Sequence, residues 1–79
     1  MRLVAEFTTE PFRGEGTPPE HAQRAWQAVQ ESGLDGQFGP LGTQFSGSAD
    51  DVLDALRTVL AAAIGAGASR VTVQLTPEH

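Results

Sequence analysis

The chain has 79 residues, a mass of 8.3 kDa and a formal net charge of −5, with five arginines, no lysine and no cysteine. This length predicts one small domain over residues 1–79. The acidic balance argues against nucleic acid as a partner, and the lack of cysteine excludes disulfides, thiolate metal sites and thiol nucleophiles. Neither a signal-peptide pattern nor an apolar run of about 20 residues is present, so we expect a cytoplasmic protein without a membrane span.

The first strand is predicted over residues 2–9, where Leu3, Ala5 and Phe7 alternate with more polar residues. A period of two is typical of a strand with one buried face. Residues 10–16 contain one proline and two glycines and are expected to form a loop.

A helix is predicted after the loop, with Thr17 as its N-cap and Pro18 as its first helical residue. An apolar stripe follows at Ala22, Ala25, Trp26 and Val29, which makes Trp26 a core residue before it is a ligand-stacking one. Gly33 is the expected left-handed residue at the end of this helix.

A hairpin is predicted over residues 34–39 and 42–47, joined by a turn through Pro40. If Gly39 lies opposite Gly42, then Phe38 lies opposite Thr43 and Gln37 opposite Gln44. This register gives Thr43 the parity of Phe38, which favours the helix-facing side. A role in contacting a small-molecule ligand favours the opposite side, so the sequence does not decide which face of the sheet Thr43 occupies.

The second helix should begin at Ser48 as N-cap, with acidic residues in its first turn, and should end around residues 65–67. Its expected apolar face is wide, and consists of Val52, Leu53, Leu56, Val59, Leu60, Ala63 and Ile64. Residues 69–76 alternate again and predict a last strand that ends at Pro77.

The resulting order, βαββαβ, predicts an α+β fold of the ferredoxin-like type, a two-layer sandwich with two helices on one face of a four-stranded antiparallel sheet in the order 4-1-3-2. The opposite face of the sheet would be open and polar. Pairing between subunits would cover more surface of so small a domain, so we expect a homodimer or homotetramer. The residues expected on the open face are Val4, Glu6, Thr8, Gln37, Gln44, Thr72 and Gln74.

No arrangement of residues indicates catalysis or a metal site. His21 is expected on the polar side of the first helix and His79 at the end of the chain, so both are interpreted as surface residues. The acidic residues near Asp50 are explained by helix capping. We therefore expect neither an enzyme nor a bound cofactor.

Glu6 is the most informative polar residue, because a carboxylate in the middle of an interior strand needs a reason to be there. It is either solvated on the open face or, if that face is covered, paired with a cationic or amino-bearing small molecule. Neutral hydrogen-bonding groups would surround such a site, and the candidate ligand-binding residues are Glu6, Thr8, Gln37, Thr43, Gln44, Thr72 and Gln74.

Four sequence pieces occur together in one family: VAEF, ESGL, GPLGT and AGASRV, in this order and spacing between residues 3 and 76. On these pieces the chain resembles the thiamine-binding protein family. The resemblance implies a ferredoxin-like fold, dimers or tetramers built through the sheets, and cytoplasmic binding of thiamine or its pyrimidine precursor hydroxymethylpyrimidine without catalysis. It also implies that Glu6 and Thr43, which match family positions, contact the ligand.

Two alternatives to thiamine binding are kept. In the first, the chain is a homo-oligomeric interaction module whose open sheet face makes only protein contacts. In the second, it is a regulatory domain that binds amino acids, a class that often shares this fold. In either case no thiamine compound would stabilise the protein.

Overall fold

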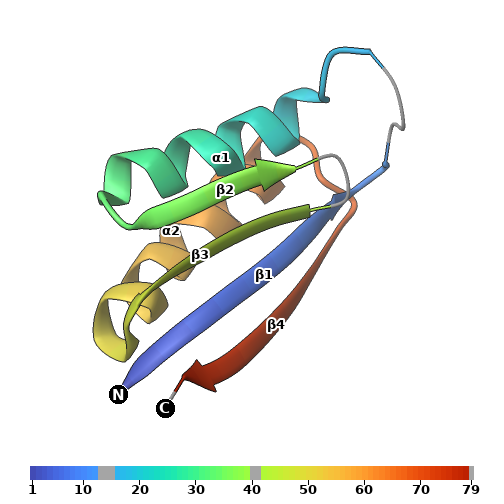
Figure 1. The fold of residues 1–79 in the computed structure, drawn as a ribbon. Helices are drawn as coiled ribbons and strands as arrows, with labels where there is room; N and C mark the ends of the chain where they lie inside the picture. Colours follow the sequence, from blue (N-terminus) through green and yellow to red (C-terminus); the bar gives the residue numbers. More distant parts are fainter. Residues whose placement is uncertain (13–15, 40–41, 79) are drawn as a thin grey trace.

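The computed structural model describes residues 1–12, 16–39 and 42–78. All neighbouring strands are antiparallel, the sheet order is β2-β3-β1-β4, and both helices cover one face of the sheet (Figure 1). The predicted ferredoxin-like α+β fold is confirmed. With 13 and 17 residues, the helices in the described ranges both fall short of a membrane-spanning helix. The elements are β1 (Arg2–Glu10), α1 (Glu20–Ser32), β2 (Asp35–Gly39), β3 (Gly42–Ser48), α2 (Ala49–Gly65) and β4 (Arg70–Glu78).

β1 lies in the interior of the sheet and pairs with β3 on one side and β4 on the other. Its burial alternates, with Leu3, Ala5 and Phe7 buried beneath the helices and Glu6 exposed. The alternation follows from the strand period of two, because successive side chains point to opposite faces.

The hairpin register is confirmed at all three predicted pairs: Gln37 with Gln44, Phe38 with Thr43, and Gly39 with Gly42. Three other expectations concern residues outside the described ranges. They are the turn at residues 40–41, part of the predicted loop at residues 13–15, and His79.

The core lies between the sheet and the helices, and its largest fully buried side chains are Phe45, Val29, Val52 and Val59. Phe7 meets Phe45 edge to face, with ring centroids 6.1 Å apart. Trp26 is half-buried, packs against this core and stacks on Phe38.

The buried face of α2 is narrower than predicted, because Leu53 and Ile64 are 49% and 64% exposed. The groove between the helices is lined on the α2 side by Thr58, Ala61 and Ala62. Leu53 and Ile64 lie on the opposite flank of the helix, away from α1. No third helix packs on that flank within the described ranges, so these side chains stay exposed.

The predicted start of α1 is wrong: the helix begins at Glu20 with Pro19 as N-cap, and no side chain caps it. A residue that precedes proline is disfavoured in the helical region, and this keeps Pro18 out of the helix. Thr17 is therefore not the N-cap, and Pro18 is not the first helical residue. The end of α1 is confirmed at Gly33, which has a φ of 76°.

The interpretation of His21 as a surface residue is also wrong. His21 is 5% exposed, because the buried stripe of α1 runs through positions 21, 25, 28 and 29. Its Nδ1 lies 2.7 Å from Oγ1 of Thr9 on β1, and the two atoms share a hydrogen bond. Nε2 of His21 is buried and has no partner among the described residues.

The start of α2 is confirmed, since the Ser48 hydroxyl accepts a hydrogen bond from the Asp51 N–H at 3.2 Å. Pro77 does not end the last strand, as β4 continues to Glu78 with Pro77 opposite Leu3. β4 is an edge strand, where a residue without a backbone N–H, such as proline, is tolerated.

The Thr9→Val substitution should destabilise the protein by about 1–3 kcal/mol, because it keeps the side-chain shape but leaves Nδ1 of the buried His21 without its partner. The melting temperature of the ligand-free protein would fall by about 4 °C or more. Thr8→Val, on the opposite face of the same strand, is the control and should change it little. Equal melting temperatures for the two variants would contradict the structural role of the Thr9–His21 pair.

The Gly36→Ala substitution should destabilise the protein by about 1–3 kcal/mol. A Cβ at this position would lie 2.8 Å from Cγ1 of Val29 and 3.0 Å from the Trp26 ring. Gly65→Ala is the control, because nothing lies within 4 Å of its Cβ position and alanine favours the helix by about 0.5–1 kcal/mol. Denaturant midpoints that move in opposite directions would support the close packing at Gly36, and an unchanged midpoint for Gly36→Ala would refute it.

Candidate ligand-binding site

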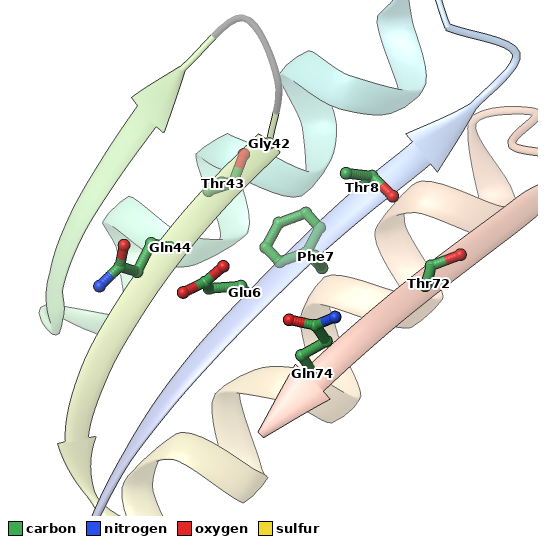
Figure 2. A pocket seen from close by; sticks show the side chains of 8 residues that line it. All are labelled: Glu6, Phe7, Thr8, Gly42, Thr43, Gln44, Thr72 and Gln74. Atoms are coloured by element: carbon green, nitrogen blue, oxygen red, sulfur yellow. The ribbon is translucent and has the colours of Figure 1, made fainter. Parts of the chain in front are cut away.

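A hollow of about 390 Å³ lies on the open face of the sheet, over β1, β3 and the first half of β4 (Figure 2). Its volume falls within the range of about 300–1,000 Å³ that is usual for small-molecule sites. Six of the seven candidate residues line it, and Gln37 does not. The lining residues are Glu6, Phe7, Thr8, Gly42, Thr43, Gln44, Thr72 and Gln74.

The hollow is built on a row of residues that crosses the sheet. Glu6 of β1 lies opposite Gln44 of β3 and opposite Gln74 of β4, and Gln44 in turn lies opposite Gln37 of β2. Residues directly opposite each other in antiparallel strands project from the same face. One carboxylate is thus flanked by an amide on each side, as Figure 2 shows, and Gln37 extends the row beyond the hollow.

Glu6 is the one carboxylate among the lining residues, and no hydrogen bond or ion pair to it is found in the described part of the chain. The two arginines of the sheet are engaged elsewhere. Arg2 pairs with Glu78 at 3.2 Å and Arg70 with Glu10 at 3.9 Å, at opposite ends of the β1–β4 ladder. The centre of the open face therefore carries a single negative charge that an incoming cation or amino group can meet.

Hydroxyl groups border the next row of the hollow, where Thr8 of β1 lies opposite Thr72 of β4. A hydroxyl can donate one hydrogen bond and accept two, so this side of the hollow can meet either a donor or an acceptor atom of a ligand.

Thr43 borders the hollow from the buried side of the sheet. It is 5% exposed and lies opposite both Phe7 and Phe38, so its side chain has the parity of the core residues. The open question about its face is thereby answered in favour of the helix-facing side. Sequence reasoning did not name Phe7 and Gly42 as lining residues, because a core phenylalanine and a glycine carry no polar signal.

The family model described as "Thiamine-binding protein" matches residues 5–78. The chain belongs to the thiamine-binding protein family. The predicted resemblance is confirmed, and both family positions, Glu6 and Thr43, lie within the matched segment and border the hollow.

Solved structures share the fold of this family member. A domain of unknown function from Bacillus cereus is 24% identical, with a TM-score of 0.69 and coverage of 95% of this chain and 72% of that chain. A Thermotoga maritima protein described as a candidate thiamine biosynthesis/salvage protein is 20% identical, with a TM-score of 0.69 and coverage of 96% and 81%. A Streptococcus pneumoniae protein is 16% identical, with a TM-score of 0.73 and coverage of 96% and 83%. A search of curated proteins gives no match.

The hollow of this thiamine-binding family member is lined mainly by side chains that can form hydrogen bonds with a ligand. Its lining side chains offer one carboxylate, two amides and the hydroxyls of Thr8 and Thr72 on the open face, while the Thr43 side chain is buried on the helix-facing side. In the described ranges no three His, Asp or Glu side chains come together as a possible metal site. The arrangement can recognise a small cationic or amino-bearing molecule through charge and hydrogen bonds.

Proposed function

We propose that this protein is a cytoplasmic, homo-oligomeric and non-catalytic binder of thiamine or of its pyrimidine precursor hydroxymethylpyrimidine, with the hollow on the open sheet face as the binding site. The observation that carries the proposal is the Gln44–Glu6–Gln74 row, in which the carboxylate has no partner within the described chain. Membership of the thiamine-binding family supports thiamine as the ligand.

The chemistry of thiamine suits this row, because the molecule joins a cationic thiazolium ring to an aminopyrimidine. The Glu6 carboxylate can accept a hydrogen bond from the amino group or offset the positive ring. The amides of Gln44 and Gln74 both donate and accept, so they can meet the ring nitrogens on either side. Thr8 and Thr72 add hydroxyl groups along the neighbouring row.

Binding rather than catalysis is supported by the groups that line the hollow. Catalytic nucleophiles are usually activated by an adjacent base, and a general base must lie within hydrogen-bond reach of the proton that it removes. The threonine hydroxyls of the hollow have no histidine among the lining residues. His21 is held by Thr9 beneath the helices, on the other side of the sheet.

A homo-oligomer is proposed because the hollow is open toward solvent. Ligand pockets bury about 70–90% of a small ligand, and a shallow depression on one sheet face cannot do so alone. A second copy of the chain would add the missing wall and reduce the large exposed surface of a 79-residue domain.

Thermal unfolding with thiamine, its phosphates and hydroxymethylpyrimidine tests the ligand. A compound present at about 100 times its dissociation constant should stabilise the protein by about 2.7 kcal/mol, which corresponds to a rise of about 10 °C or more. An aliphatic amine of similar charge is the control compound and should have little effect. If none of the thiamine compounds shifts the transition, the protein is better explained as an interaction or regulatory module.

The Glu6→Gln substitution should weaken binding of the stabilising compound by about 10- to 100-fold, because hydrogen bonds to a charged group contribute about 1.5–3 kcal/mol. The melting temperature of the free protein should change little, since Glu6 is exposed and unpaired in the described structure. Isothermal titration calorimetry measures the affinity. Glu31→Gln, the same change on the exposed surface of α1, is the control, and an equal affinity in both variants would remove Glu6 from the site.

A further inference from the structure

The hollow on the open sheet face consists of two neighbouring rows of residues whose side chains differ in length. The first row, the carboxylate row, is Gln44, Glu6 and Gln74. The second row, the short row, is Gly42, Thr8 and Thr72. Thr8 lies opposite Thr72, and the register of β1 with β3 sets Gly42 beside Thr8 (Figure 2). Residues two positions apart in a strand are about 6.5 Å apart, so the two rows offer room for two groups side by side.

The row on the other side of Glu6 leaves no such space. There Val4 of β1 lies opposite Ser46 of β3 and Thr76 of β4, and all three positions carry side chains. None of these three described residues lines the hollow. Among the described residues, the hollow therefore extends from Glu6 in one direction, toward the short row.

Gly42 keeps the short row open. A Cβ at this position would lie 3.1 Å from the carbonyl oxygen of Phe7 and 3.3 Å from Cγ2 of Thr8. Even the methyl group of alanine would thus fill the space beside Thr8. Gly39 of β2 lies opposite Gly42, so the row continues toward the sheet edge without a side chain. A glycine within a strand is typical of a place where a ligand approaches the backbone closely.

We propose that the short row is a second subsite, which holds the second ring of a two-ring ligand, and that Gly42 determines the specificity for such a ligand. The carboxylate row then holds the amino-bearing ring. The inference rests on the proposed function and deepens it, because it selects thiamine, which has two rings, over hydroxymethylpyrimidine, which has one.

The chemistry of the two rows matches the two halves of thiamine. In the carboxylate row, Glu6 accepts a hydrogen bond from the amino group of the pyrimidine ring. Its charge lies about 6.5 Å from the short row, close enough to attract the cationic thiazolium ring there. That ring lies over the backbone at Gly42. Its hydroxyethyl group reaches the Thr8 and Thr72 hydroxyls, which can both donate and accept hydrogen bonds.

Hydroxymethylpyrimidine fills only the carboxylate row. It lacks the positive ring and leaves the short row to water, so it makes fewer contacts with the hollow than thiamine does. We expect thiamine to bind about 10-fold more tightly or better, which corresponds to one or two additional hydrogen bonds.

Isothermal titration calorimetry of Gly42→Ala with both compounds tests the role of the glycine. The added methyl group should weaken thiamine binding by about 10-fold or more, and should change the affinity for hydroxymethylpyrimidine by less than about 3-fold. Gly39→Ala is the matched control, because it adds a methyl group to the same hairpin at a residue that does not line the hollow. Unchanged thiamine binding in Gly42→Ala, or an equal loss for both compounds in a folded variant, would overturn the proposal.

A pair of threonines on β4 tests the hydroxyl groups of the short row. Thr72 and Thr76 lie two residues before and two residues after Gln74, and of the two only Thr72 lines the hollow. Thr72→Val should weaken thiamine binding by about 3- to 10-fold and leave hydroxymethylpyrimidine binding unchanged, whereas Thr76→Val should affect neither. Both substitutions keep the side-chain shape, so this comparison decides if Gly42→Ala fails to fold. Equal thiamine affinities of the two variants would refute the second subsite.

The second subsite and the proposed function fail separately. If hydroxymethylpyrimidine binds the native protein as tightly as thiamine and Glu6→Gln weakens both, the hollow is the binding site and the second subsite is refuted. If neither compound binds, the proposed function fails and the second subsite fails with it. A loss of thiamine binding in Gly42→Ala and Thr72→Val, with hydroxymethylpyrimidine binding retained, would support both.

Discussion

The register of β1 between β3 and β4 is the constraint on which the rest of the structure depends. It sets Leu3, Ala5 and Phe7 beneath the two helices and leaves Glu6 on the open face. A slip of one residue would exchange the two sets and bury a carboxylate in the core, which costs several kcal/mol. The register that builds the core therefore also places the one acidic group of the hollow.

The distribution of charge on the sheet follows from the same ladder. Arg2 and Arg70 meet Glu78 and Glu10 at the two ends of the β1–β4 pair, while the row through Glu6 holds only amides beside it. An exposed ion pair adds about 0–1 kcal/mol to stability, so these pairs stabilise the fold only slightly. Their main consequence is that they engage the guanidinium groups of Arg2 and Arg70. Because both arginines have partners, the charge of Glu6 remains available to a ligand.

Much of the fold could be predicted, because its signals are local. The alternation in residues 2–9, the Ser48 cap and the glycine after the first helix each act within a few residues, and the hairpin register follows from its short connection. The predictions failed where a neighbouring residue or strand determined the local structure. Pro19 disfavours a helical conformation at Pro18, so α1 begins later than predicted. His21 is buried and has a hydrogen-bonding partner in Thr9. The edge position of β4 allows Pro77 to remain in the strand.

By itself, the sequence determined which residues share a face of each strand, because the direction of successive side chains is a property of the local backbone. It thus placed Glu6, Gln44 and Gln74 on the open face before any strand was paired with another. Only the tertiary structure decided that these three lie in one row, that Thr43 belongs to the buried side, and that His21 has a buried partner. Those facts depend on pairing between segments far apart in the chain, and this pairing is set by the packing of the whole core.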